Sequence, residues 1–216
     1  MVGLDQIDDL ARPHALAVMG AFHKGAAPLP EGVETLVMLG PREPGFWAHF
    51  TQSPEYCDTL PDPMDRWSRR VIDRLADSLD AHAFFPFATT PPHPFYTWAK
   101  ATGRAWSSPV QFLVHDVAGL WVSYRGALGF ANRLNLPPPP TESPCTHCTK
   151  PCLTACPVDA LTQTGYELTA CHAYLNTFSG QECMTGGCAV RAACPISCNY
   201  GRNPAQSAFH MRQFHT

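Results

Sequence analysis

The stretch that decides how the last third of this chain is built runs from residue 145 to residue 157 and reads Cys145-Thr146-His147-Cys148-Thr149-Lys150-Pro151-Cys152-Leu153-Thr154-Ala155-Cys156-Pro157. Its four cysteines have the spacing C-x2-C-x3-C-x3-C, and a proline follows the last of them. The chain has 216 residues and 10 cysteines, and every cysteine except Cys57 lies between Cys145 and Cys198. This uneven distribution predicts a small, cysteine-held domain after a larger domain with an ordinary core.

The rest of the composition favours metal over disulfides as the partner of these thiols. The formal net charge is -3 and no basic run is present, so we expect no nucleic-acid partner. No apolar run of about 18 residues occurs, so we expect no membrane partner. The acidic start of the chain does not resemble a secretory signal. We therefore expect a cytoplasmic protein, where thiols stay reduced and clustered cysteines point to metal.

The spacing of the first run is close to that of two-cluster bacterial ferredoxins, C-x2-C-x2-C-x3-C-P, in which the fourth cysteine binds the other cluster. A second half of the pattern follows, because Ala155-Cys156-Pro157 is echoed by Ala193-Cys194-Pro195. Each cysteine before a proline is expected to start a helix, with the proline at its first position. The prediction is a 4Fe-4S cluster held by four cysteines, namely Cys145, Cys148, Cys152 and Cys194.

A second 4Fe-4S cluster is predicted on Cys156 together with three further cysteines, and the four candidates for these are Cys171, Cys183, Cys188 and Cys198. An alternative is that Cys198, rather than Cys194, closes the first cluster through Cys194-x3-Cys198. Zinc, which usually takes four ligands in two pairs, and a disulfide scaffold are two further alternatives for the thiols. Cys57 stands apart, and we expect it to be a small buried side chain.

Cysteines in this arrangement, with Cys171-His172-Ala173-Tyr174-Leu175 between the two halves, resemble the di-cluster domain of the epoxyqueuosine reductase and reductive dehalogenase family. In that family a lone cysteine in a Cys-x-x-Tyr-Leu-like segment also binds the second cluster. The resemblance therefore implies that the second set is Cys156, Cys171, Cys183 and Cys188, with Cys198 left over.

The resemblance extends more loosely to residues 92–121, which are similar in order to part of the family's upstream domain. That domain binds cobalamin, so the resemblance implies cobalamin as an additional cofactor. Where the family has an acidic proton donor, this chain has Phe87-Ala88-Thr89-Thr90.

The first two-thirds of the chain predict a mixed domain, so the expected fold class is α+β, with an N-terminal α/β domain followed by a small di-cluster ferredoxin-like domain. The four prolines at 137–140 form a stiff linker. They place the boundary between a domain of residues 1–140 and a domain of residues 141–216. Expected helices are 4–22, interrupted at Pro13, then 65–79, capped by Asp65, and 95–103, ended by Gly103. Expected strands are 34–40, 83–87, 110–115 and 120–124, and residues 41–63 are expected to be irregular.

Two functions are compatible with these motifs. The first is an iron–sulfur electron-transfer protein that serves a redox partner protein or a small-molecule acceptor. The alternative is an iron–sulfur-dependent oxidoreductase whose N-terminal domain holds cobalamin or another redox cofactor. Under that alternative, the first polar residues to test are His93, His115, Asp116, Tyr124 and Arg125. A third hypothesis makes the clusters structural staples of an interaction module.

Overall fold

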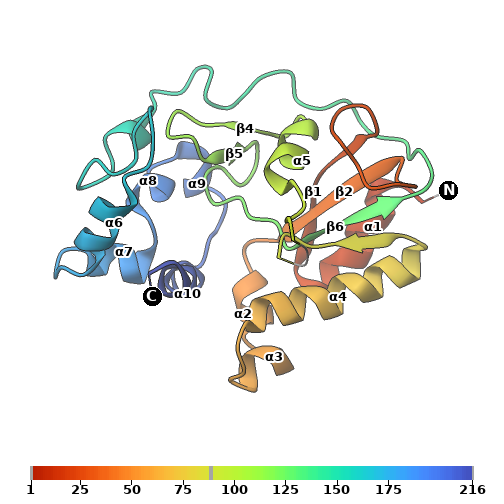
Figure 1. The fold of residues 1–216 in the computed structure, drawn as a ribbon, viewed down its shortest axis with the longest axis horizontal. Helices are drawn as coiled ribbons and strands as arrows, with labels where there is room; N and C mark the ends of the chain where they lie inside the picture. The colour runs from red at the N-terminus through yellow and green to blue at the C-terminus, as the bar shows by residue number, and fades with distance from the viewer. Residues whose placement is uncertain (1, 88–89, 216) are drawn as a thin grey trace. The chain divides into compact units, whose positions relative to one another are not determined.

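The computed structural model describes residues 2–87 and 90–215, and its mixture of helices and strands is an α+β fold (Figure 1). Of the segment at 87–90 considered above, Ala88 and Thr89 lie outside the described residues. The chain divides into two compact units. The N-terminal unit comprises the residues up to Arg104 together with Ser123–Thr141. The C-terminal unit combines Ala105–Val122 with the residues from Glu142 onward.

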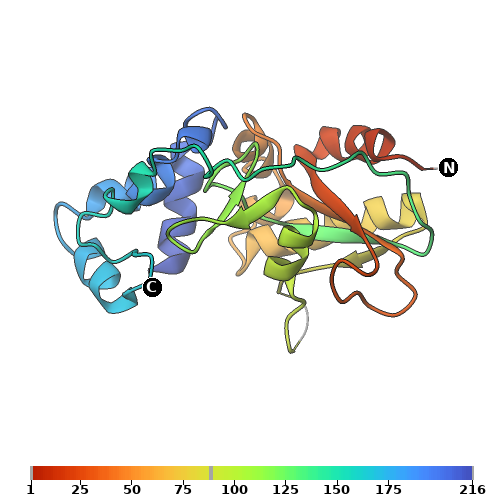
Figure 2. The same ribbon diagram turned by 90° about the horizontal axis from the view of Figure 1, so that it is seen from above.

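The N-terminal unit is built on a four-stranded antiparallel sheet. Its strand order is β1 (Leu16–His23), β2 (Thr35–Pro41), β6 (Gly126–Phe130) and β3 (His82–Phe84). All seven residues of β2 are buried, because this central strand is covered on both faces. Helix α4 (Pro63–Leu79) contacts β3 and β6, helix α5 (Phe95–Ala101) contacts β1, and the two helices lie on opposite sides of the sheet (Figures 1 and 2).

Helix α4 forms because its apolar side chains recur on one face, which it buries. Trp67 on that face meets Phe46 and Phe50 of α2 (Phe46–Phe50), with ring centroids 5.3 Å and 5.9 Å apart in edge-to-face geometry. Each such fully buried aromatic side chain contributes about 1.5–3 kcal/mol of transfer free energy. The remaining helical elements of this unit are α1 (Leu4–Ala11), a 3-10 turn η1 (Arg12–His14) and α3 (Pro54–Cys57).

The C-terminal unit begins with a hairpin of β4 (Ala105–Ser107) and β5 (Leu113–His115). After Glu142 it continues as short helices, namely η2 (Pro151–Leu153), α6 (Leu168–Leu175), α7 (Gln181–Gly186), α8 (Ala189–Ala192), α9 (Pro195–Cys198) and α10 (Pro204–Phe214). The apolar core joins the two segments, because Val110, Val114 and Leu120 pack with Cys152, Leu161, Val190 and Cys194. Two of the predicted ligands therefore belong to the hydrophobic core of this unit.

Several of the predicted elements are confirmed. The strand expected at 34–40 is β2, and the helix expected at 65–79 is α4. The helix expected at 95–103 is α5, and Gly103 follows it with φ +68°, a conformation in which glycine is favoured. Asp65 does not cap α4, however; the helix begins at Pro63, and Asp62 is its N-cap.

Other expectations were wrong. The helix predicted over 4–22 ends after Ala11, and Leu16–His23 is the edge strand β1. Residues 41–63 are not wholly irregular, because they contain α2 and α3. The strand predicted at 120–124 is absent from the described chain, and β6 follows it at Gly126–Phe130 instead. Cys57 is exposed at the end of α3 rather than buried.

The observed units differ from the expected division at residue 140 by one internal segment. Ala105–Val122 belongs with the C-terminal unit, since Leu120 donates its backbone N–H to Ser197 Oγ at 2.9 Å and its side chain lies in the core described above. The prolines at 137–140 remain with the N-terminal unit. Among the described residues, no helix combines the length and the apolar character needed to cross a membrane.

Candidate metal centre

The first predicted set of cysteines comes from three places in the C-terminal unit. Cys145 and Cys148 lie in the loop before η2, Cys152 lies within η2, and Cys194 precedes α9 as its N-cap residue. The loop can turn between the second and third cysteines because Lys150 adopts a left-handed conformation with φ +58°. Cys152 and Cys194 are buried, with 6% and 7% of their surfaces exposed.

These four sulfur atoms lie within electrostatic reach of one another. Burial raises the pKa of Cys145, and negative charge on Cys148 and Cys194 raises it further. Burial also raises the pKa of Cys152, and negative charge on Cys145, Cys194 and Cys148 raises it further. As thiolates the four groups would repel one another, so the donor set suits a ligand that brings positive charge among them.

A cavity of about 370 Å³ adjoins this set. Cys145, Cys148 and Cys194 line it together with apolar side chains that include Val114 and Ile196. A water molecule occupies about 30 Å³ in the liquid, so the space could hold about a dozen waters, far more than a single metal ion requires. The soft thiolate donors fit an iron–sulfur cluster, and three of the four predicted ligands line this pocket.

The second predicted set is spread over the helical part of the same unit. Cys156 lies in a turn, Cys171 lies in α6, Cys183 lies in α7 and Cys188 precedes α8. Burial raises the pKa of Cys188, and negative charge on Cys183 also raises it.

Two tyrosines connect the members of this second set. The hydroxyl of Tyr166 donates to Cys171 Sγ at 3.2 Å, and its pKa is raised by burial, by that hydrogen bond and by the charges of Cys171 and Cys188. Tyr174 lies within electrostatic reach of both Cys183 and Cys156. Each of these tyrosines thus lies near two cysteines of the second set, and the role of all eight cysteines as ligands stays a prediction.

Backbone N–H groups also point at sulfur in both sets. Lys150 N–H donates to Cys148 Sγ at 3.3 Å, and Ala160 N–H donates to Cys156 Sγ at 3.2 Å. Donors of this kind stabilise a thiolate over a thiol, because they favour the charged form. They would equally stabilise the more negative, reduced form of a cluster bound there.

Arg191 places a positive charge beside the second set, although no sequence motif marks it. Its guanidinium donates to Leu120 O and lies 4.5 Å from the centroid of the Phe112 ring. Burial lowers the pKa of Arg191, whereas negative charge on Cys188 and Tyr166 raises it. From the sequence alone, only its place three residues after Cys188 could have indicated that Arg191 lies near the second set of cysteines.

Cys198 has a different environment from the eight cysteines above. It is exposed at the end of α9, where its thiol donates to Ala192 O at 3.4 Å. The two Cys-Pro steps also differ. Pro195 is the first residue of α9, as predicted, but Pro157 lies in a turn and does not begin a helix, which corrects the expectation for that half.

The described part of the chain contains no preformed site for a single metal ion. Within residues 2–87 and 90–215, no group of three or more His, Cys, Asp or Glu side chains is arranged to hold one such ion. The two histidines of the region have other contacts. His147 lies 3.4 Å from Glu142 at the surface, and His172 Nδ1 lies 2.7 Å from His215 Nδ1.

The polar residues proposed for an N-terminal reductase site are divided between the two units. His115 and Asp116 belong to the C-terminal unit, where His115 Nδ1 lies 2.9 Å from Asp116 Oδ1 and accepts from the N–H of Val117 at 3.2 Å. His93, Tyr124 and Arg125 belong to the N-terminal unit.

Within that unit, His93 and Arg125 have local structural contacts. His93 stacks on Trp98, with ring centroids 5.4 Å apart, and the partly buried Arg125 lies 4.0 Å from Asp65. Burial raises the pKa of Asp65, and Arg125 lowers it. These contacts supply no argument for a cobalamin site.

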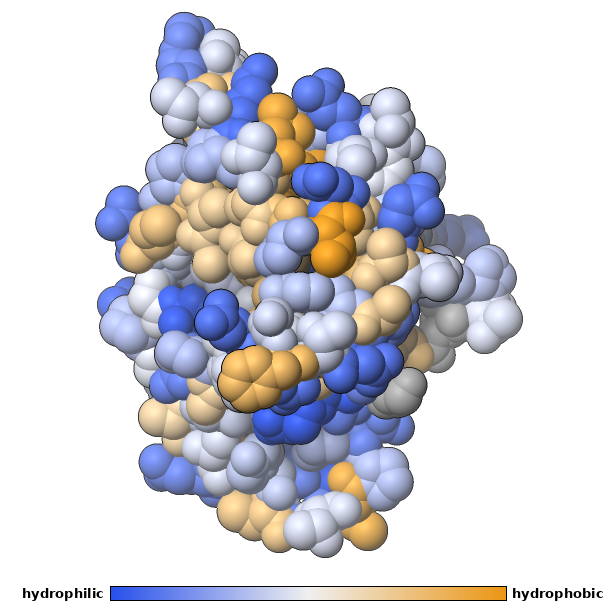
Figure 3. Space-filling model, turned by 90° about the vertical axis from the view of Figure 1, so that its left-hand side faces the viewer, coloured by the Kyte–Doolittle hydropathy of each residue, from blue (hydrophilic) through white to orange (hydrophobic). Residues whose placement is uncertain are grey.

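Among the described residues, the surface of the C-terminal unit exposes a few large apolar side chains, namely Val117, Val158, Leu168, Phe178 and Phe214. Figure 3 shows apolar residues near the middle of the face that it presents, bordered by hydrophilic ones. Phe178 is 96% exposed in the turn between α6 and α7, so it contributes almost no packing energy.

The chain was compared with models of protein families, with curated proteins and with solved structures, and none of them matches it.

Proposed function

We propose that this protein binds two 4Fe-4S clusters and transfers single electrons. The first cluster is assigned to Cys145, Cys148, Cys152 and Cys194, and the second to Cys156, Cys171, Cys183 and Cys188. The observation that carries the proposal is the proximity of the first four thiols, since charge on Cys145, Cys148 and Cys194 raises the pKa of Cys152. The second set is supported by Tyr166 and Tyr174, each of which lies near two of its cysteines.

The kind of metal centre follows from the separation that each centre imposes on its thiolates. Four thiolates around one zinc ion lie about 2.3 Å from the metal, and tetrahedral geometry therefore brings the sulfurs within about 4 Å of one another. A cubane binds one thiolate to each of four irons, so its width keeps the sulfurs farther apart. Nine cysteines within one small unit, two of them followed by proline, support two clusters over a single zinc site, which needs only four ligands.

When bound, a 4Fe-4S cluster supplies one reversible electron at a potential that the protein sets. The donors on Cys148, Cys156 and Cys171 withdraw negative charge from sulfur and so favour the reduced state. Arg191 acts in the same direction from inside the unit. Lys150, the cation that lowers the pKa of Cys145 in the first set, is exposed, whereas Arg191 beside the second set is partly buried, so we expect the second cluster to have the higher potential.

We expect the electrons to be exchanged with a protein or a small-molecule acceptor in the cytoplasm. The direct test is reversible reduction of anaerobically purified protein. Dithionite should bleach a broad visible absorption, and a mild oxidant should restore it over repeated cycles. A colourless protein that contains one zinc per chain and takes up no electrons would refute the proposal.

A further inference from the structure

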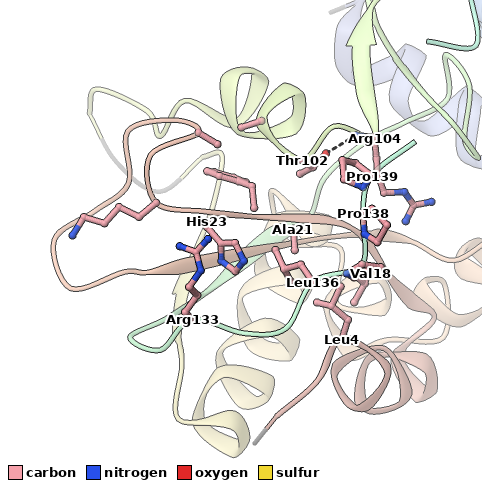
Figure 4. A pocket seen from close by; sticks show the side chains of 16 residues that line it. Leu4, Val18, Ala21, His23, Thr102, Arg104, Arg133, Leu136, Pro138 and Pro139 are labelled. Atoms are coloured by element: carbon pink, nitrogen blue, oxygen red, sulfur yellow. Dashed lines mark hydrogen bonds between the residues drawn. The ribbon is translucent and has the colours of Figure 1, made fainter. Parts of the chain in front are cut away.

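The N-terminal unit contains a cavity of about 500 Å³ that the proposed electron transfer does not use. It lies against β1, the edge strand of the sheet, and its other side is formed by the end of α5 and the proline-rich segment. Ligand-binding cavities are typically about 300–1,000 Å³ with mainly apolar walls and a few polar groups. This cavity has that size and that character (Figure 4).

The titratable side chains that line the cavity are all basic. They are His23, Lys24, Arg104 and Arg133, and no carboxylate occurs among the described residues that line it. Lys24 is paired with Glu34 at 2.9 Å, and the basic groups of interest are the neighbouring Arg133 and His23. This concentration is unexpected in a chain whose formal net charge is -3, and it makes the cavity attractive to anions.

The basic groups stand on either side of an apolar surface. Figure 4 shows Arg133 beside His23 at one side and Arg104 at the other, with Ala21 and Leu136 between them. Burial lowers the pKa of His23, and the positive charge of Arg133 lowers it further. The effect of Arg133 on His23 shows that the two side chains are close enough to interact electrostatically. A ligand that fits this surface has an apolar body and an acidic group.

A buried threonine holds the Arg133–His23 pair in place. Thr35 is fully buried, and its hydroxyl donates to Asn132 O at 3.0 Å and accepts from Leu134 N–H at 3.0 Å. The same oxygen lies 3.2 Å from His23 Nδ1. One hydroxyl thus fixes the backbone on both sides of Arg133 as well as the ring of His23, which is the support that a preorganised binding site requires.

We propose that this cavity binds a small organic anion, with its carboxylate or phosphate held by Arg133 beside the ring of His23 and its apolar body lying over Ala21 and Leu136. An arginine fork matches both acidic groups through two parallel hydrogen bonds. The proposal concerns the N-terminal unit alone and does not depend on the iron–sulfur assignment.

The test is isothermal titration calorimetry of the full chain with three probes, namely phenyl phosphate, inorganic phosphate and benzyl alcohol. We expect saturable binding of phenyl phosphate, weaker binding of inorganic phosphate, and no binding of benzyl alcohol up to about 10 mM. Absence of phenyl phosphate binding over that range would overturn the proposal. Equal affinity for benzyl alcohol would also overturn it, because the charge would then be irrelevant.

Variants locate the binding. Arg133→Gln changes an exposed side chain, so it should leave the far-ultraviolet circular dichroism spectrum unchanged and weaken phenyl phosphate binding by roughly tenfold or more. Thr35→Val keeps every charge but removes the fixing hydroxyl, and a several-fold loss is expected. The matched control is Arg74→Gln on α4, outside the cavity, which should change nothing. Equal losses in Arg133→Gln and Arg74→Gln, or wild-type affinity in Arg133→Gln, would refute the assigned site.

Discussion

Replacing Cys194, the N-cap of α9, or Cys198, the last residue of α9, tests which of the two cysteines is the fourth ligand of the first cluster. Cys194 is 7% exposed and within electrostatic reach of Cys145 and Cys152, whereas Cys198 is exposed and bonded only weakly, to Ala192 O at 3.4 Å. Cys194→Ser removes one of four thiolates from the first set. We expect the iron content to fall from about eight to about four per chain, because three thiolates hold a cubane poorly.

Cys198→Ser is the matched control, since it makes the same atomic change four residues along the chain. The thiol is exposed, so the free energy of unfolding should change by less than about 0.5 kcal/mol and the iron content should stay at about eight. The assay is iron and acid-labile sulfide per chain after anaerobic purification, with circular dichroism as the check of folding. The reverse pattern would assign Cys198 to the cluster, and full iron in both variants would refute the first set altogether.

Two further predictions concern hydrogen bonds. Tyr166→Phe removes the O–H group that donates to Cys171 Sγ. Potentiometric titration should then show that the reduction potential of one of the two clusters falls by roughly 20–60 mV, with the iron content unchanged. Two unshifted potentials would contradict the assignment of Cys171 as a ligand. In the N-terminal unit, hydrogen bonds from Arg70 are the main cause that lowers the pKa of Glu55. The ionised Glu55 carboxylate therefore stabilises the folded state at pH values above its ordinary pKa. This stabilisation is lost as the pH falls through the lowered pKa of the folded state. Glu55→Gln should therefore reduce the free energy of unfolding by about 1–3 kcal/mol at pH 7, and by progressively less below about pH 4. The measurement is urea unfolding followed by tryptophan fluorescence. A difference in unfolding free energy that does not depend on pH would show that the charge of Glu55 is not responsible.

Elements with a strong local pattern could be predicted from the sequence. Helix α4 has apolar residues at helical spacing over 17 residues, and β2 is a short apolar run that ends at a Gly-Pro pair. Both patterns arise from neighbours along the chain, so no long-range information is needed. Strand β1 was missed because its apolar residues, read together with those of α1, fit helical spacing, and only pairing with β2 decides between the two conformations.

Strand β6 was hidden by its composition. Gly126 and Gly129 weaken its strand signal, yet both positions need glycine, since a Cβ at Gly126 would lie 2.8 Å from Ile72 and one at Gly129 would lie 2.6 Å from the Phe84 ring. The membership of the β4–β5 hairpin in the C-terminal unit was equally out of reach. It depends on contacts between Leu120 and residues more than 70 positions away, which local patterns do not encode.

For the candidate site, the spacing predicts which cysteines bind each cluster, and that assignment stays a prediction. The C-x2-C-x3-C run implies one loop, and the repeated Cys-Pro step suggested that Cys194 would join it. What spacing could not supply is the environment of the sulfurs, namely the hydroxyl of Tyr166 and the guanidinium of Arg191. Both reach the second set through tertiary packing, and both bear on the potential rather than on the presence of a cluster.

Whether each chain holds two clusters is best decided by native mass spectrometry of the anaerobically purified protein, because this method counts the atoms bound to each intact molecule. We expect one dominant species whose mass exceeds that of the polypeptide by two Fe4S4 units, with no zinc adduct. A dominant species with a single zinc ion would contradict the assignment of the eight cysteines to two clusters. So would a bare chain that gains no Fe4S4 unit on reconstitution with iron and sulfide under reducing conditions.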